Sequence, residues 1–198
     1  MAEFPIFGAM KKQVVLASGS PRRSEILKLI GVDFRVVVSG EEEKPSSTNP
    51  LDFPKENAAI KALAVSRLEK GEIVLGFDTL VFLDGKPLGK PKDEADALQM
   101  LKKLNGRGHT VITGVAVAKD GELLKCSDEK TEVIFRENTD EELQEYVNSK
   151  DPLDKAGAYG IQTAGARLIK AISGCYYNVV GLPVAKTLQV MGEAGVKV

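Results

Sequence analysis

The sequence lacks an excess of either charge, because its 27 Lys and Arg residues nearly balance its 28 Asp and Glu residues, for a formal charge of −1. This balance argues against binding of nucleic-acid polymers through bulk positive charge. Long hydrophobic runs are also missing: no stretch approaches the roughly 18–20 apolar residues that span a bilayer. We therefore expect no membrane partner, and any anion site must be local.

Cysteine is scarce as well. Cys126 and Cys175 stand far apart and form no CxxC pair, so we expect reduced thiols and a cytoplasmic location. Residues 1–12 lack the charged-then-apolar order of a signal peptide, and we interpret them as partly a tag or a disordered segment. The length of 198 residues fits one domain, with room for two lobes.

Several catalytic motifs are absent. His109 is the only histidine and no serine lies in a GxSxG motif, which argues against a Ser–His or Cys–His nucleophile. The chain has neither GxxxxGK(S/T) nor GxGxxG, so neither a P-loop nor a Rossmann nucleotide site is indicated. No multi-histidine or CxxC set supports zinc.

What the sequence does contain is an alternation of apolar strand and helix patterns. Strands are predicted at about 13–17, 34–38, 73–83, 110–118 and 123–135, and helices at about 21–30, 55–68, 94–105, 140–147 and 183–192. The stretch 157–172 resembles a hairpin with Gly165 at its bend. Because hairpins interrupt the alternation, the pattern favours an α/β fold with a mixed sheet rather than a purely parallel one.

The segment Ser18-Gly19-Ser20-Pro21-Arg22-Arg23 lies between a predicted strand and a predicted helix. Ser20 suits the N-cap and Pro21 the first helical position. Two arginines at the positive end of the helix dipole cost about 0.3–1 kcal/mol each, which a bound anion would reverse. The segment therefore indicates a phosphate site, the alternative being that both arginines point into solvent.

Acidic residues form the second signal. Asp78 interrupts an apolar strand, where a carboxylate is costly unless it is paired, metal-bound or protonated. The alternative is a structural carboxylate that accepts backbone N–H groups. The run Glu41–Glu43 adds carboxylates at a strand end, although such a run is also typical of a solvated face. Together these oxygens suit a hard cation such as Mg²⁺ held with substrate phosphates.

Lys61, Lys90 and Lys155 lie on a helix or beside turns, and each by itself is typical of a solvated surface residue. Tyr176-Tyr177 could stack on a base, but such a pair more often packs in a core. Taken together, the phosphate-compatible loop, the acidic residues and the lysines suit metal-assisted attack of water on a phosphorus centre.

Collinear motifs carry a resemblance over about residues 14–188. They are LASGSPRR (16–23), DT (78–79), GKP (89–91), NGRGHTVITGV (105–115), DKAGAYGIQ (154–162) and NVVGLP (178–183). The set resembles the Maf family of nucleoside triphosphate pyrophosphatases.

The resemblance implies hydrolysis of a nucleoside triphosphate to the monophosphate and pyrophosphate with a divalent metal, Mg²⁺ or Mn²⁺. It implies an elongated two-lobed α/β fold with a mixed twisted sheet and a central cleft, related to inosine triphosphate pyrophosphatases, and a homodimer. The strand around Asp78 together with 154–162 resembles the subgroup that acts on dTTP and UTP.

Carried over by motif, the resemblance implies roles for eight residues. Asp78 would activate water as a base or metal ligand, and Glu43 would be the second catalytic or metal-site acid. The others are Lys61 and Lys90, which would neutralise phosphates, Ser18, Arg22 and Arg23, which would hold phosphate oxygens, and Gln162, which would lie near the substrate.

Two departures bear on specificity. Phe77 stands where the family has a small residue, so it either reshapes the pocket or repacks the strand. Across 44–54 the match is loose, which leaves Glu41 and Glu42 as alternatives to Glu43. Two other functions also stay open: a nucleotide-binding regulator of cell division, and a phosphatase of another phosphorylated metabolite.

Overall fold

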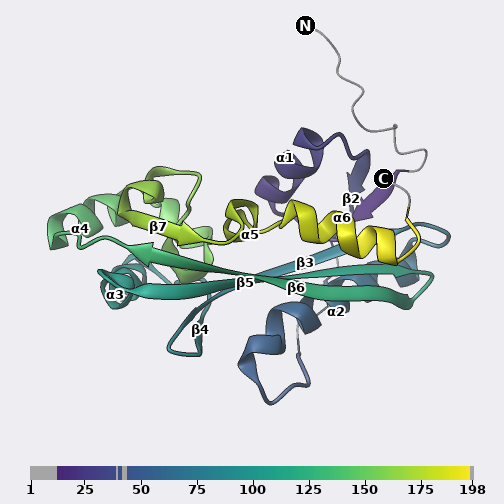
Figure 1. Cartoon of the computed structure of the whole chain (residues 1–198), viewed down its shortest axis with the longest axis horizontal. Coiled ribbons are helices and arrows are strands. Elements are labelled where there is room, and N and C mark those ends of the chain that lie inside the picture. The colour runs from purple at the N-terminus through teal and green to yellow at the C-terminus, as the bar shows by residue number, and fades with distance from the viewer. Residues whose placement is uncertain (1–12, 39, 42–43, 197–198) are drawn as a thin grey trace, which may run out of the picture.

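A computed structural model describes residues 13–38, 40–41 and 44–196 and shows one mixed sheet with helices on both faces (Figure 1). The predicted mixed α/β architecture is confirmed. The interpretation of residues 1–12 and the role predicted for Glu43 lie outside the described residues.

The strands are β1 (Val14–Leu16), β2 (Phe34–Val36), β3 (Val74–Leu83), β4 (Lys86–Leu88), β5 (Gly108–Lys119), β6 (Glu122–Phe135) and β7 (Ile169–Ser173). The helices are α1 (Pro21–Leu29), α2 (Phe53–Leu68), α3 (Glu94–Leu104), α4 (Asp140–Asn148), α5 (Tyr176–Val180) and α6 (Val184–Glu193). Short 3-10 helices cover Pro50–Asp52, Asp151–Asp154, Ala156–Ala158 and Ala164–Leu168.

Strand order leaves part of one strand edge open. The sheet runs β2-β1-β3-β5-β6-β7, with β1 parallel to β2 and β3, the later pairs antiparallel, and β4 paired to β3. On one edge of β3 the pairing with β1 ends at Leu75 and the pairing with β4 begins at Val81. Within the described residues, the edge between them pairs with no strand, and the loop after β1 lies beside it.

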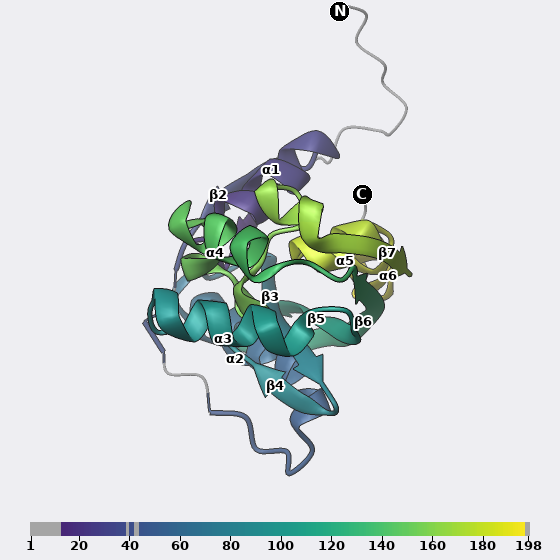
Figure 2. The same cartoon turned by 90° about the vertical axis from the view of Figure 1, so that its left-hand side faces the viewer.

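Helices divide between the two faces of the sheet. Helix α2 contacts β3 and β5 on one face, whereas α5 and α6 contact β5 and β6 on the other, as Figure 1 shows. Buried side chains of α1 and α6 share a core with Phe77 and Val115 of the sheet. Helices α3 and α4 pack on each other at one end of the molecule, which faces the viewer in Figure 2.

Two glycines let α2 lie unusually close to the sheet. A Cβ on Gly76 would lie 2.2 Å from the carbonyl oxygen of Ala58, and one on Gly114 would lie 2.1 Å from that of Pro54. Gly114 also stands directly across from Asp78 in the β3–β5 register. The absence of side chains here brings the helix against the strand that carries Asp78.

Local capping signals are confirmed. Ser20 is the N-cap of α1 with Pro21 in its first turn, as predicted, and Thr139 with Glu142 forms a capping box at the start of α4. The Ser20 side chain makes no capping hydrogen bond; instead, the Ser20 amide donates to Ser18 Oγ at 3.3 Å.

The hairpin predicted at 157–172 is wrong. Short 3-10 turns fill this segment, and only Ile169–Ser173 is a strand. Gly157 and Ala158 both have positive φ, which turns the chain back on itself. A Cβ on Gly165 would lie 2.7 Å from the Gly160 carbonyl oxygen, so Gly165 marks a close contact between turns rather than a hairpin bend.

Candidate active site

A cavity of about 330 Å³ opens along the unpaired edge of β3. Its lining includes polar and charged residues, namely Ser20, Arg22, Arg23, Asn57, Lys61, Asp78, Lys90, Asp154 and Lys155. It also includes largely apolar residues, among them Leu80, Val81, Val111, Tyr159, Val179 and Val180. Arg22 and Asp78 therefore share one cavity, which combines cationic groups with apolar side chains.

A second hollow of about 390 Å³ adjoins the first and is lined by the loop after β1, including Ser18 and Gly19. The two hollows share Ser20, Arg22, Arg23, Lys61, Lys90 and Asp154. Glu41, the described member of the predicted acidic run, lines the second hollow. The shared wall is thus mainly cationic, as an extended polyphosphate requires.

Asp78 is a buried carboxylate with two partners on α2. It is 8% exposed, and its oxygens accept from Lys61 Nζ at 2.6 Å and from Asn57 Nδ2 at 3.1 Å. Asn57 and Lys61 are four residues apart, so they lie on one face of the helix. The expectation that Asp78 needs a partner is confirmed, and the partner comes from the helix that Gly76 and Gly114 admit to the sheet.

Arg23 is committed to protein partners. Its Nε donates to the Gly181 carbonyl at 2.9 Å, Nη1 to Ser18 Oγ at 2.8 Å and Nη2 to Thr79 Oγ1 at 3.1 Å. These bonds tie the loop after β1 to β3 and to the turn after α5. Direct phosphate binding by Arg23 stays a prediction; the contacts seen here hold the loop in place.

Arg22 pairs with an acidic residue from a distant part of the chain. Its Nη1 donates to Asp154 Oδ2 at 2.7 Å, joining α1 to a 3-10 helix 132 residues further along the chain. The Arg22 side chain is 25% exposed, so its guanidinium stays accessible from the cavities that it lines.

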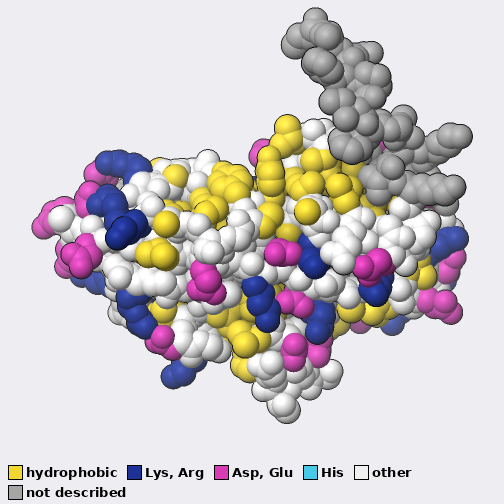
Figure 3. Space-filling view, in the orientation of Figure 1, with side chains coloured by type: hydrophobic (Ala, Val, Ile, Leu, Met, Phe, Trp, Pro, Cys, Tyr) yellow, Lys and Arg dark blue, Asp and Glu magenta, His cyan; other side chains and the backbone are white. Residues whose placement is uncertain are grey.

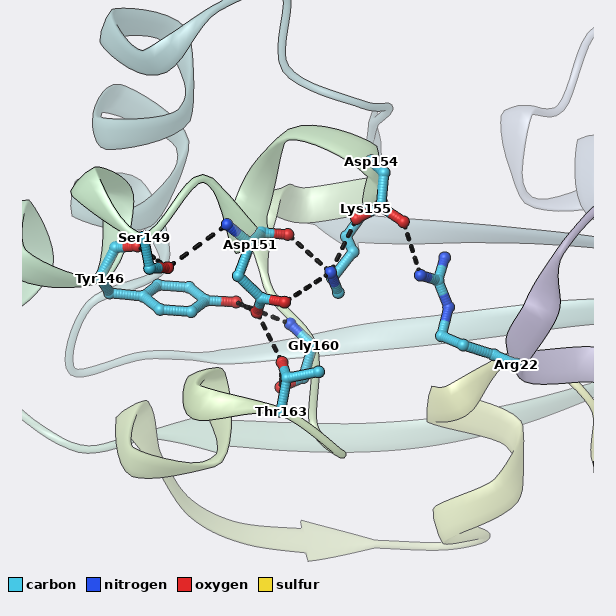
Figure 4. Close-up of polar contacts among 8 residues, drawn as sticks. All are labelled: Arg22, Tyr146, Ser149, Asp151, Asp154, Lys155, Gly160 and Thr163. Atoms are coloured by element: carbon cyan, nitrogen blue, oxygen red, sulfur yellow. Dashed lines mark hydrogen bonds and ion pairs between the residues drawn. The ribbon is translucent and has the colours of Figure 1, made fainter. Parts of the chain in front are cut away.

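Asp154 belongs to a polar network centred on the buried Lys155 (Figure 4). Lys155 Nζ donates to Asp151 Oδ1 at 2.9 Å, to the Asp151 carbonyl at 2.6 Å and to Asp154 Oδ1 at 2.7 Å. Asp151 Oδ2 in turn accepts from the hydroxyls of Tyr146 and Thr163, each at 2.6 Å. The expectation of a solvated surface lysine is wrong for Lys155, which is 7% exposed.

The network also holds both aspartates ionised. Burial alone would raise the pKa of Asp151, but hydrogen bonds from Thr163, Tyr146 and Lys155 outweigh it and lower that pKa below its ordinary value. For Asp154, burial likewise opposes the hydrogen bonds from Lys155 and Arg22, and the net effect is again a lowered pKa. The segment beside the cavity is therefore fixed by charge-assisted bonds.

His109 lies behind the cavity wall and takes no part in nucleophilic chemistry. It is 3% exposed, contacts Phe135 and Tyr159 edge to face, and shares a 2.7 Å hydrogen bond between Nε2 and the Tyr159 hydroxyl. Burial lowers the pKa of His109 to about 4. The ring is thus neutral at physiological pH and supports Tyr159, which lines the cavity.

This buried histidine predicts a specific acid sensitivity. Between pH 6.5 and about 4 the unfolded chain binds a proton at His109 and the folded chain does not, so stability falls as the pH falls through this window. At about 1.4 kcal/mol per pKa unit, the total loss is about 3 kcal/mol, complete below the folded-state pKa. Urea unfolding of wild type and His109→Gln at a series of pH values measures it. A constant difference between the two proteins from pH 7 to pH 4 would contradict the assignment.

Phe77 repacks the strand and does not reshape the cavity. Its side chain is fully buried in the core under α1 and α6, on the face of β3 opposite to Asp78, and it does not line either hollow. The Arg23 guanidinium lies 5.8 Å from its ring centroid. Of the two alternatives that the sequence left open, the structure supports repacking.

The other predicted site residues surround the same space. Lys90 and Gln162 are exposed and line the first cavity, and Ser18 lines the second hollow. Seven of the eight are described, and only Glu43 falls outside. Their placement brings them together, while their individual roles stay predictions.

Sequence reasoning missed three contributors: Asn57, Asp151 and Asp154. Asn57 had a usable signal, because it lies one helical turn before Lys61 and so shares its face. Asp154 stands in the DKAGAYGIQ motif, but nothing local indicates a partner as distant as Arg22.

The fold and the cavity define an α/β protein with a cationic cleft built around a buried carboxylate. The chain belongs to the Maf family: a family model described as Maf-like protein matches residues 13–194.

Curated relatives match along nearly their whole length. A dTTP/UTP pyrophosphatase of Dictyoglomus turgidum is 44% identical over 189 residues, covering 94% of this chain and 98% of that protein. A dTTP/UTP pyrophosphatase of Symbiobacterium thermophilum is 47% identical over 185 residues, covering 93% and 95%. Among solved structures, a HAM1 protein from Coxiella burnetii matches 62% of this chain and 72% of its own with a TM-score of 0.46 and 21% identity.

Proposed function

We propose that this protein is a nucleoside triphosphate pyrophosphatase that hydrolyses dTTP and UTP to the monophosphate and pyrophosphate. The observation that carries the proposal is the convergence of Arg22, Lys61 and Lys90 with Asp78 in one cavity. The relatives of known name, 44–47% identical over more than nine-tenths of this chain, support the choice of dTTP and UTP.

In the proposed reaction, a water oxygen bonds to the α-phosphorus while the bond from that phosphorus to the bridging oxygen breaks. The electron pair leaves with pyrophosphate, and the water proton passes to Asp78 or to solvent. Arg22, Lys61 and Lys90 neutralise the triphosphate and the charge that develops on the leaving group. Lys61 and Asn57 orient the Asp78 carboxylate through the hydrogen bonds described above.

A divalent cation, Mg²⁺ or Mn²⁺, fits the donor set beside Asp78. Asp78 and Asn57 both line the cavity, and Asn57 Oδ1, which is buried, has no hydrogen-bond donor among the described residues, so hard oxygen donors lie beside the cavity. We assign the metal to Asp78 and Glu43, with the substrate phosphates completing its coordination. When bound, the cation would polarise the phosphate and lower the pKa of a bound water.

The apolar part of the cavity is assigned to the base and sugar. Val111, Val179 and Val180 offer flat apolar contact, and Gln162 offers an amide that both donates and accepts hydrogen bonds. A pyrimidine carries both kinds of group on its edge, so we assign Gln162 to hydrogen bonding with the base.

The expected result of a substrate panel is release of pyrophosphate and monophosphate, fastest from dTTP and UTP. The measurement uses purified protein, dTTP, UTP, CTP, ATP and GTP, with Mg²⁺ or Mn²⁺, and chromatographic resolution of the products. Orthophosphate with a nucleoside diphosphate would refute cleavage at the α-phosphorus. Neither the regulator nor a phosphatase of other metabolites is favoured by any contact of the described residues.

A homodimer in the cytoplasm is proposed with this activity. Apolar side chains gather over the region of α1 and α6 in Figure 3, and Leu29 of α1 is 68% exposed. Exposed apolar faces of this kind are typical of protein interfaces. Light scattering after size exclusion would give the mass in solution. No helix in the described part of the chain is long and apolar enough to cross a membrane.

A further inference from the structure

The two carboxylate oxygens of Asp154 bind two cationic side chains that differ in burial. Oδ1 accepts from Lys155 at 2.7 Å, and Oδ2 accepts from Arg22 at 2.7 Å, as Figure 4 shows. The Lys155 side chain is 8% exposed and held also by Asp151, whereas that of Arg22 is 25% exposed. One oxygen is therefore anchored in the protein, and the other meets an accessible guanidinium.

This second contact occupies the group that a phosphate would use. Arg22 lines both hollows, and Asp154 lies with it in the wall that they share. A carboxylate and a phosphate present similar paired oxygens to a guanidinium. An anion that binds Arg22 through the same N–H group must first displace Asp154.

We propose that the Asp154 carboxylate competes with phosphate for the Arg22 guanidinium. This competition weakens binding of the anionic products and so promotes their release. The proposal rests on the pyrophosphatase function proposed above and names a regulator of that same site. Asp154 is a positioning residue, because it acts on the substrate only through Arg22.

The surrounding network suits this exchange. When Arg22 turns to a phosphate, Asp154 keeps Lys155 as its counter-ion, so its carboxylate is not left unpaired. The Asp154 side chain is 60% exposed, which lets water solvate the freed oxygen. Asp151 stays bonded to Lys155, Tyr146 and Thr163, so the segment keeps its place while Arg22 moves.

The size of the effect follows from the exposure of the pair. Ion pairs of this kind are worth little individually, so the competition weakens anion binding only modestly, by about three- to fivefold. Salt screens such a pair, and the competition should fade as ionic strength rises.

The test measures binding of inorganic pyrophosphate to wild type and Asp154→Asn by titration calorimetry at low salt. The asparagine still accepts from Lys155 through Oδ1 but has no charge for Arg22. We expect the variant to bind pyrophosphate about three- to fivefold more tightly, with the gap closing in high salt. A loss of structure would weaken binding, so tighter binding separates competition from damage.

Two further variants isolate the cause. Asp151→Asn removes a carboxylate from the same network without touching Arg22, and it should leave pyrophosphate binding unchanged or weaker. In an Arg22→Ala background, Asp154→Asn should no longer tighten binding, which makes a double-mutant cycle. Asp154→Ala serves as a second variant at the same position and should also bind more tightly.

Unchanged or weaker pyrophosphate binding in both Asp154 variants would overturn the proposal, as would tightening of the same size in Asp151→Asn. Absence of pyrophosphate binding in every protein would overturn it too, since Arg22 would then hold no phosphate. Product analysis in the nucleotide panel reports separately on the pyrophosphatase function, so calorimetry tests the competition whatever that assay gives.

Discussion

Replacement of Asp78 by asparagine is expected to lower kcat for dTTP by at least about 10²-fold, the usual cost of removing a general base or a metal-ligand carboxylate. The asparagine keeps the size of the side chain and an oxygen that accepts from Lys61. It loses the charge that either role requires. Initial rates of pyrophosphate release at saturating dTTP and metal measure the change, with thermal unfolding recorded to confirm that the variant is folded.

Asp84→Asn provides a matched control at the end of the same strand. Asp84 is a surface carboxylate, 68% exposed, that pairs with Arg107 at 2.8 Å and lies outside both hollows. Its positive φ is one that asparagine tolerates well. We expect wild-type turnover from this variant. Near-full activity in Asp78→Asn would show that Asp78 has been assigned the wrong role.

The same variant separates the two roles that Asp78 could take. A metal ligand lost at this position should lower the apparent affinity for Mg²⁺ in a titration of activity, because fewer protein oxygens hold the ion. A lost base should leave that affinity unchanged and lower kcat alone.

The parts of the site that the sequence predicts are those set by local rules. Ser20 and Pro21 begin α1 where capping preferences place its first turn. Asp78 interrupts an apolar strand, and the cost of burying it predicts a carboxylate that is paired, metal-bound or protonated. Which residue pairs with it does not follow, because several lysines lie on predicted helices. The choice of Lys61 depends on how α2 packs across the sheet.

The predictions that failed concern one segment whose short turns pack against one another. Lys155 looks like a surface residue in sequence, but it donates to Asp151, which also accepts from Tyr146 and Thr163, and this network exists only when 151–163 folds into compact turns. The hairpin prediction at 157–172 failed for the same reason. Gly165 does not form the bend of a hairpin but packs against Gly160.

Two glycines inside strands indicate the close packing of α2 on the sheet. Gly76 and Gly114 lie in β3 and β5 at ordinary φ values, so no turn requires them. A glycine in the interior of a strand often marks close approach of another part of the backbone. Here that backbone is α2, which carries Asn57 and Lys61 to Asp78, so the active-site geometry depends on two missing side chains.

Gly114→Ala is accordingly expected to damage stability and activity together. The new Cβ would lie 2.1 Å from the Pro54 carbonyl oxygen and 2.6 Å from Lys55 Cα, and both are backbone atoms that no rotamer change can move. Overpacking typically costs 1–3 kcal/mol, and we expect about 3 kcal/mol here because the helix itself must shift. A displacement of α2 near 1 Å would also lower kcat by about 10²-fold, since Lys61 and Asn57 move with it.

Gly192→Ala is the matched control for this substitution. Gly192 lies in α6, and among the described residues no atom beyond its own helix backbone and chain neighbours lies within 4 Å of where its Cβ would be. Alanine should therefore stabilise the protein by a few tenths of a kcal/mol through helix propensity and leave kcat unchanged. Urea unfolding and dTTP turnover of both variants give the comparison. If Gly114→Ala were as stable and active as wild type, α2 would not be pressed against the sheet, and the 2.6 Å contact of Lys61 with Asp78 would need another explanation. Loss of turnover without loss of stability would instead mean that the helix moves at little cost, so that Gly114 serves the placement of Lys61 and Asn57 more than the fold.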